Sequence, residues 1–265
     1  MRVGAESASD PAFRHWSERP LPSDYWEDFS AGARGWIANS QSQLPIQKGH
    51  ALCRGPWIVD ANHAPPGAGY LHLLMHIHTL EERLNAPYAR EAGMYPDDFL
   101  RARGHAFIHG GFSRNLTNLL VRIRARGIME MRGAEMTVLV QSQPDPQGPR
   151  ANWVLTGQRF VLQEEWSEQE LCLTADPSQW TFLGSRRDLT SLYGYVPLAD
   201  VLADVNVSFI FVLFPILVEP VVAVADRHQA WAGRDYPVRE NLLPEGEIEF
   251  DSVWFRYPRT TNSNV

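Results

Sequence analysis

Three histidines stand close together in the segment Tyr70–Thr79, which reads YLHLLMHIHT. Imidazole binds metals and exchanges protons near neutral pH, so such a group could hold a ligand or do acid–base chemistry. As a β-strand, the segment places His72, His76 and His78 on one face and most of its apolar residues on the other. As a helix, it would separate His78 from the other two. The strand is favoured because a Pro/Gly turn, HAPPGAG at 63–69, comes directly before it.

The histidine face has three interpretations that the sequence leaves open. It could contact a ligand, it could bind a metal, or its imidazoles could simply bond water and neighbouring side chains. The last is the commoner fate of histidines on a half-exposed strand.

Two later segments also alternate polar and apolar residues. In 115–126, NLTNLLVRIRAR, the arginines Arg122 and Arg124 oppose apolar neighbours, and in 134–143, AEMTVLVQSQ, so do Gln141 and Gln143. If these strands lie beside the histidine strand, the polar faces converge. We therefore predict one ligand-binding surface, formed by the residues His72, His76, His78, Arg122, Arg124, Gln141, Gln143 and, as an aromatic platform, Trp153.

That surface suits a sugar, because indole stacks on sugar C–H faces and polar side chains bond hydroxyl groups. Two arginines in register would favour an anionic sugar, since the guanidinium fork pairs with a carboxylate or a sulfate. The alternative is that Arg122, Arg124 and Arg126 form an ordinary solvated strand face paired with neighbouring Glu or Asp. Alternation alone predicts both arrangements equally well.

The strands themselves are short and separated by Gly, Pro and Asp turns, which predicts an all-β fold, a β-sandwich or jelly roll. A short helical insertion is expected at 80–104 and a short helix at Leu198–Asp204. The apolar run Val205–Glu219 is expected to be a central strand buried on both faces. We divide the chain into a flexible N-terminal arm (1–23), the sandwich domain (24–257) and a disordered tail (258–265).

Composition narrows the function classes. A net charge of −7 over 265 residues argues against a nucleic-acid partner, which would require a surplus of Lys and Arg. The longest apolar run, Phe209–Val218, is too short to span a membrane. No signal peptide is visible, so we expect a soluble protein, cytoplasmic or secreted with a signal absent from this chain. Cys53 and Cys172 stand in apolar settings and are expected to be free thiols.

The order of features resembles the carbohydrate-binding-module type of β-jelly roll. Such domains open with an acidic-aromatic stretch and a Gly-Trp turn, continue through a Trp-containing strand, and close on I-x-x-D-x-V-x-F. The matching positions are Glu27–Phe29, Gly35–Trp36, Glu165–Leu173 and Ile248–Phe255. The resemblance spans about residues 24–255, but a helical insertion at 80–104 and a Pro-rich loop at 220–245 depart from it.

In domains of that type the terminal strands often share a structural calcium. The resemblance therefore implies Ca²⁺ as a cofactor, with Glu27, Asp28 and Asp251 as oxygen donors, because hard Ca²⁺ prefers carboxylates and carbonyls. The alternative is that these acids are surface caps or turn residues.

Three functions follow as hypotheses. The first is recognition of an oligosaccharide or polysaccharide, with acidic glycans among the candidates. The second is a polysaccharide lyase that cleaves a uronate polymer by β-elimination, with His76, His78 and Tyr70 as the catalytic groups. The third is a structural or protein-interaction β-sandwich, since Trp and Tyr anchor interfaces as well as cores. The sequence leaves the oligomeric state open.

Overall fold

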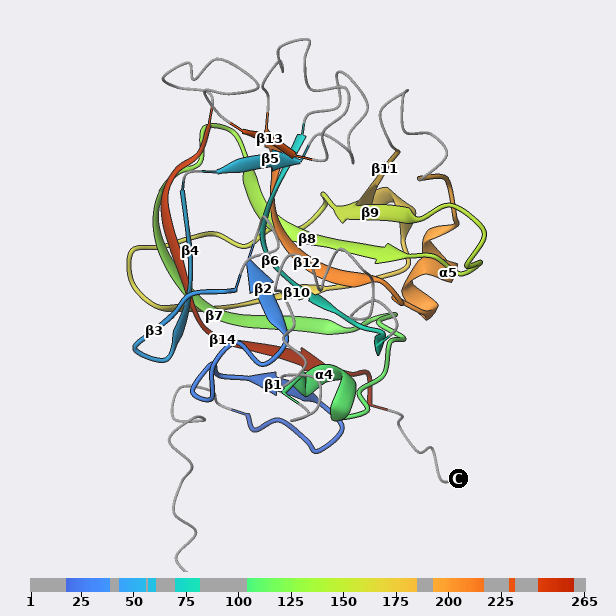
Figure 1. Ribbon diagram of the computed structural model, residues 1–265, viewed down its shortest axis with the longest axis horizontal. Coiled ribbons are helices and arrows are strands. Elements are labelled where there is room, and N and C mark those ends of the chain that lie inside the picture. The colour runs from blue at the N-terminus through green and yellow to red at the C-terminus, as the bar shows by residue number, and fades with distance from the viewer. Residues whose placement is uncertain are drawn as a thin grey trace, which may run out of the picture.

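The computed structural model describes residues 18–38, 43–55, 57–60, 70–81, 104–184, 193–216, 229–231 and 243–259. These residues form two antiparallel β-sheets packed as a sandwich, with only short helices (Figure 1). The predicted all-β sandwich is confirmed. The helical insertion expected at 80–104 falls almost wholly outside the described residues, as do most of the proposed N-terminal arm and tail, so the domain bounds stay predictions.

The first sheet has six strands and is ordered β10-β7-β14-β4-β3, with β1 also paired to β14. Two long strands, β7 and β14, run together through its middle (Figure 1). The strands are β1 (Tyr25–Glu27), β3 (Ile46–Gln47), β4 (His50–Arg54), β7 (Leu120–Glu130), β10 (Ser167–Cys172) and β14 (Glu245–Arg256).

The second sheet has eight strands in the order β11-β9-β8-β12-β6-β5-β13, with β2 also paired to β6. The segment with the three histidines is β6, so it lies in this sheet. The strands are β2 (Trp36–Ala38), β5 (Ile58–Asp60), β6 (Tyr70–His78), β8 (Glu135–Ser142), β9 (Ala151–Leu155), β11 (Trp180–Leu183), β12 (Ser208–Ile216) and β13 (Gln229–Trp231).

The main core lies between the two sheets and is rich in aromatic rings. Phe209 of β12 packs against Phe255 of β14 with ring centroids 4.6 Å apart, and Phe211 packs against Phe250 at 5.2 Å. Strand β12 is buried along nearly its whole length, as its continuous apolar run predicts. Its even-numbered residues Ile210, Val212 and Phe214 form a second apolar cluster on the outer side of the eight-stranded sheet.

The helices of the described ranges are short and lie in the connections between strands. Helix α5 (Leu198–Ala203) confirms the short helix expected there, and η3 (Pro177–Gln179) precedes β11. Helix α4 (Ala106–His109) begins at His105, whose Nδ1 accepts a hydrogen bond from the backbone N–H of Ile108. No helix within the described ranges is long and apolar enough to cross a membrane. Cys53 and Cys172 are both free thiols, as predicted.

Candidate functional site

Four polar side chains form one row on the outer face of the eight-stranded sheet. The register pairs Asn152 of β9 with Gln141 of β8, Gln141 with Ser208 of β12, and Ser208 with His78 of β6. Their sequence neighbours Trp153, Val140, Phe209 and Ile77 all lie in the main core. Because successive strand residues point to opposite faces, the four polar side chains point outward. We call Asn152, Gln141, Ser208 and His78 the neutral row.

An aliphatic row runs directly beside the neutral row. The same register aligns Val154, Leu139 and Ile210 across β9, β8 and β12, and the line ends on His76 of β6. The three aliphatic side chains belong to the second apolar cluster. The outer face of this sheet therefore carries a polar strip next to an apolar strip, both running across the strands.

Two pairs in the neutral row are joined by hydrogen bonds. The Gln141 amide Nε2 donates to Asn152 Oδ1 at 2.7 Å. Ser208 Oγ lies 3.0 Å from His78 Nδ1, which is also 3.1 Å from the carbonyl oxygen of Val207. Since a carbonyl only accepts, the proton of His78 resides on Nδ1. His78 therefore does not remove a proton from Ser208 through this nitrogen, and the pair is not arranged as a nucleophile and its base.

Two polar atoms on this face have no hydrogen-bond partner within the described part of the chain. They are Nδ2 of Asn152 and Nδ1 of His76. Asn152 is fully buried and His76 is 7% exposed. Leaving such a buried group unpaired costs about 1–3 kcal/mol. A ligand that bonds both atoms would recover that free energy, and these two atoms are the specific signal for a ligand here.

The imidazoles near the row are held neutral. Burial, and then the neighbouring His78, lower the pKa of His76 well below its ordinary value. The same two causes, with His109 third, lower the pKa of His105 to about 3. The His105 ring rests against Gly35, where a Cβ would lie 2.8 Å from ring atoms of His105. At neutral pH, therefore, neither imidazole brings a positive charge to this face.

His72 does not join the other two histidines, which corrects the predicted three-histidine face. The pairing of β6 with β12 shifts between Phe211 and Val212, so that Leu74 becomes the extra residue of a β-bulge. The bulge reverses the alternation, and His72 pairs with the core residue Leu213. Its ring contacts Trp57 at the edge of the main core, with centroids 4.5 Å apart.

Arg122 and Arg124 lie in the other sheet, so the predicted convergence with the histidines and glutamines is wrong. They point outward from β7 of the six-stranded sheet, since Val121, Ile123 and Ala125 fill the core. The guanidinium of Arg122 stacks on Trp254 at 4.9 Å, and those of Arg124 and Arg126 stack on Trp166 at 4.9 and 4.7 Å. The two polar faces are on opposite sides of the sandwich.

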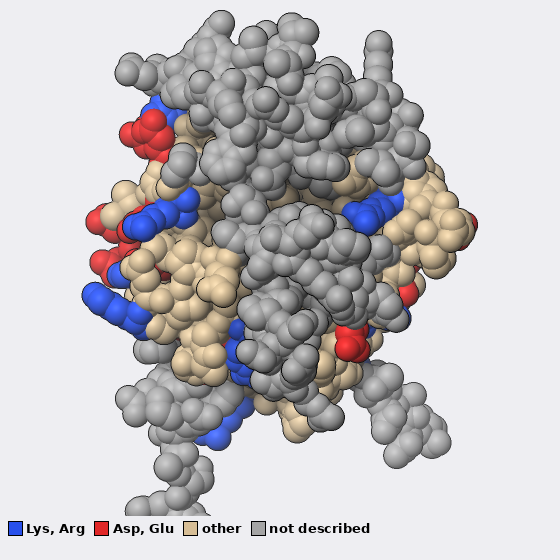
Figure 2. All heavy atoms as spheres, in the orientation of Figure 1, with Lys and Arg blue, Asp and Glu red and all other residues tan. Residues whose placement is uncertain are grey.

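Each of these arginines also pairs with a carboxylate, which is the alternative that the sequence left open. We call Arg122, Arg124, Arg126 and their partners the charged ladder. The ion pairs are Arg122 with Glu170 and Glu18, Arg124 with Asp251, and Arg126 with Glu249. In Figure 2 the left margin, where Figure 1 draws β4, β7 and β14, shows basic and acidic side chains interspersed.

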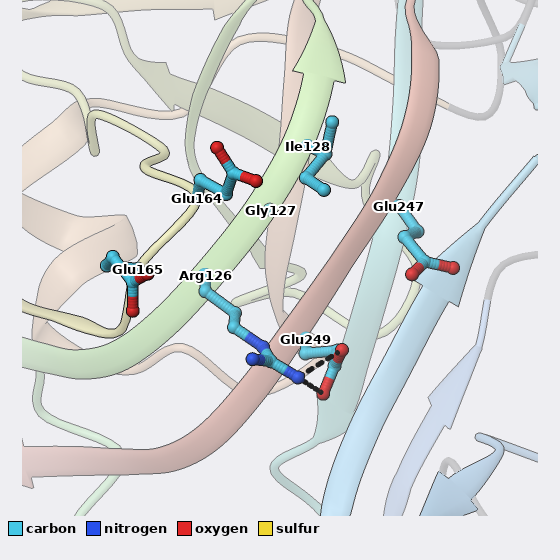
Figure 3. A pocket seen from close by; sticks show the side chains of 7 residues that line it. All are labelled: Arg126, Gly127, Ile128, Glu164, Glu165, Glu247 and Glu249. Atoms are coloured by element: carbon cyan, nitrogen blue, oxygen red, sulfur yellow. Dashed lines mark hydrogen bonds and ion pairs between the residues drawn. The ribbon is translucent and has the colours of Figure 1, made fainter.

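A pocket of about 270 Å³ opens on this same sheet (Figure 3). Arg126 turns toward Glu249 and bonds both of its carboxylate oxygens at 2.9 and 3.1 Å. Four glutamates and one arginine give the pocket a negative balance, which disfavours an anionic sugar. The lining residues are Arg126, Gly127, Ile128, Glu164, Glu165, Glu247 and Glu249.

The remaining predicted ligand residues are used elsewhere. Gln143 lies beyond the end of β8, and its amide donates to the carbonyls of Pro146 and Gly148 in the following turn. Trp153 points into the main core, and its indole N–H donates to the Val196 carbonyl at 3.0 Å. Tyr70 begins β6, but its side chain lies outside the described part of the chain.

The three proposed calcium ligands do not face one another. Glu27 pairs with the core residue Val253 and is fully buried, 3.8 Å from Arg34. Asp28 caps a turn by accepting from Ser30, and Asp251 lies on the outer face beside Arg124. No group of three His, Cys, Asp or Glu among the described residues could hold a metal ion. Calcium binding stays a prediction that metal analysis can test.

Sequence reasoning missed Asn152, Ser208 and His105. Asn152 is the single polar residue of the apolar strand ANWVL, and Ser208 is the polar residue that opens the apolar strand SFIFVLFPI; these positions were the available signal. His105 could not have been found, because only the tertiary contact with Gly35 brings it to this sheet.

Comparisons with known proteins give no sequence match and a distant structural similarity. No protein-family model matches the sequence, and no curated protein matches it. Among solved structures, the chain is similar to the L4b domain of human laminin alpha-2, at 9% identity and a TM-score of 0.29, over 89% of this chain and 98% of that one. It is also similar to a native glycosidic hydrolase, at 9% identity and a TM-score of 0.31, over 91% and 99%. At this level of likeness neither comparison bears on function.

Proposed function

We propose that this protein recognises an uncharged carbohydrate through the neutral row of its eight-stranded sheet, which is at least nine-tenths buried and which a sugar reaches only when the part of the chain that covers it moves. The observation that carries the proposal is the neutral row beside the aliphatic row, with unpaired polar atoms on Asn152 and His76. A sugar has hydroxyl groups that donate and accept, together with apolar C–H faces. The two strips match these two kinds of surface.

The charge of the ligand follows from where the arginines lie. An acidic glycan would need a cation, and the arginines first expected to supply one are in the charged ladder of the other sheet. The neutral row contains no Lys or Arg, and the depressed pKa of His76 keeps its imidazole uncharged. An anionic sugar would therefore lose its hydration there without gaining an opposite charge.

Isothermal titration against matched neutral and uronate oligosaccharides tests this proposal. We expect heat only with neutral sugars, and a loss of affinity of about tenfold in Asn152→Ala, which removes the unpaired Nδ2. Arg124→Gln, on the opposite sheet, is the matched control and should bind normally. Binding of uronates that disappears in Arg124→Gln would place the site on the charged ladder and overturn the proposal.

A lyase acting on a uronate polymer is the second candidate, and His76 is the observation that favours it. A neutral imidazole with an unpaired nitrogen can act as a general base. The amides of Gln141 and Asn152 would then have to neutralise the uronate carboxylate. Ultraviolet absorbance of an unsaturated product, lost in His76→Ala, would support this candidate, whereas no absorbance with any polyuronate would reject it.

A further inference from the structure

Three buried imidazoles meet where helix α4 joins strands β2 and β6. His76 and His78 of β6 are buried, and their ring centroids lie 5.3 Å apart. His105, at the start of α4, is fully buried. After burial, His78 is the next cause that lowers the pKa of both His76 and His105, so its ring lies near each of them. We call His76, His78 and His105 the imidazole cluster.

The start of α4 is held against the eight-stranded sheet by packing and by a hydrogen bond. The His105 ring rests on Gly35, where a Cβ would lie 2.8 Å from ring atoms, so water does not fit between them. The next residue, Ala106, donates its backbone N–H to the Arg34 carbonyl at 2.9 Å. Gly35 directly precedes β2, and β2 pairs with β6. This corner therefore carries the contact of α4 with β2 and, through β2, with β6.

The titratable and charged groups described near the imidazole cluster offer it no opposite charge. After burial, it is other imidazoles that lower the pKa further, His78 for His76, and His78 and His109 for His105. The residues opposite His76 and His78 across β12 and β2 are uncharged, and they are Ile210, Ser208 and Ile37. The charged groups of the adjoining segments are either paired with each other or exposed, and they are Arg34 with Glu27, Arg114 with Asp204, and Glu81.

Protons therefore favour an opened corner over the closed one. Burial lowers the pKa of His105 to about 3 and that of His76 well below its ordinary value. In an opened corner both rings are hydrated and regain a pKa of about 6.5. Below that pH the open form takes up two protons that the closed form refuses. The ratio of open to closed molecules should then rise about a hundredfold for each pH unit.

We infer that the imidazole cluster is an acid latch: its protonation separates α4 from β2 and β6 while the two sheets stay packed on each other. The opening is local because α4 has only four residues, so releasing it breaks fewer contacts than parting the sheets. The facing residues of the sheets are apolar and do not respond to pH in this range. This inference is independent of the proposed sugar recognition.

Amide hydrogen exchange measured against pH tests the latch. The protection factor of the Ala106 amide should fall about a hundredfold per pH unit below 6.5. At pH 5 it should be at least about tenfold smaller than that of the Ile123 amide in β7, and it should respond less to low concentrations of urea, because a local opening exposes less surface than global unfolding. Equal protection of the two amides at every pH, or protection of Ala106 that does not change with pH, overturns the latch.

Replacing one imidazole at a time counts the protons. His105→Asn keeps an acceptor for the backbone N–H of Ile108 at the start of α4 but does not titrate. His105→Asn and His76→Asn should each reduce the pH dependence of the Ala106 protection factor from about a hundredfold to about tenfold per pH unit. His50→Asn, on the six-stranded sheet, is the matched control and should leave it unchanged. The slope with pH is informative even where a variant loosens the corner at every pH. An unchanged slope in His105→Asn or His76→Asn contradicts the latch.

Discussion

The outer faces of the two sheets both carry polar side chains, but they differ in how those side chains are paired. The charged ladder on the six-stranded sheet carries full charges, but each arginine is stacked on an indole and paired with a carboxylate. The neutral row on the eight-stranded sheet carries no full charge and is at least nine-tenths buried. Yet Nδ2 of Asn152 in the row and Nδ1 of His76 beside it have no hydrogen-bond partner among the described residues.

The difference shows which kind of polar surface points to a ligand. In a partly exposed ion pair the two charges bind each other and are also hydrated, so neither group requires a ligand. Buried neutral groups are not hydrated. An unpaired donor or acceptor among them therefore costs folding free energy until a ligand forms a hydrogen bond with it. The less conspicuous face is therefore the better candidate site.

The largest expected effect concerns pH, to which the two sheets respond with opposite signs. Burial raises the pKa of Glu27 in β1 to about 7, from an ordinary value of 4.5. The folded protein thus holds a proton that the unfolded chain has lost, and stability falls as pH rises from 4.5 to 7, by about 3 kcal/mol in total. Glu27→Gln should therefore stabilise the protein by about that amount at pH 8 in urea unfolding.

His105, which packs against the eight-stranded sheet, gives the opposite dependence of stability on pH. Because burial lowers the pKa of His105 to about 3, the folded protein resists a proton that the unfolded chain accepts below 6.5. Stability present above pH 6.5 is lost as pH falls, by about 2 kcal/mol between pH 6.5 and 5.

Glu247→Gln, at an exposed position of β14, is the control for Glu27→Gln. A wild-type profile that Glu27→Gln leaves unchanged would contradict the buried carboxyl.

The next effect isolates the contact of His105 with the eight-stranded sheet. Gly35 and Gly32 both have positive φ, 111° and 92°, so an alanine is strained at either position. At Gly35 the new Cβ would also lie 2.8 Å from His105, while at Gly32 nothing lies within 4 Å. We expect Gly35→Ala to destabilise the protein by about 2 kcal/mol more than Gly32→Ala does.

Urea unfolding of these two variants measures the difference directly. Because the backbone strain is common to both, the excess in Gly35→Ala reports the packing of the imidazole. Equal destabilisation of the two variants would show that the His105 ring moves aside without cost, and would contradict its tight packing against Gly35.

The smallest effect compares one hydrogen bond on each face. Gln141→Leu leaves Asn152 Oδ1 without its buried donor and should cost about 2 kcal/mol. Arg126→Gln breaks an ion pair whose arginine side chain is 40% exposed and should cost less than about 1 kcal/mol. Unfolding in urea at low and high salt distinguishes them, since salt weakens only the Arg126 contribution. A larger loss in Arg126→Gln would reverse the comparison between the faces.

The sequence alone determined the fold class and the faces of the regular strands. Alternation in β7 put Val121 and Ile123 inside and the arginines outside, and the continuous apolar run of β12 marked a strand buried on both sides. These features follow from the period of two in a strand and from burial, both of which are local properties of the chain.

Only the tertiary structure decided which strands share a sheet. Alternation is the same whatever a strand pairs with, so it could not show that Arg122 belongs to one sheet and Gln141 to the other. Nor could it show the bulge at Leu74, which a single extra residue in the pairing creates and which turns His72 into the core. The neutral row joins positions 78, 141, 152 and 208, and the physical reason it exists is long-range packing between strands far apart in the chain.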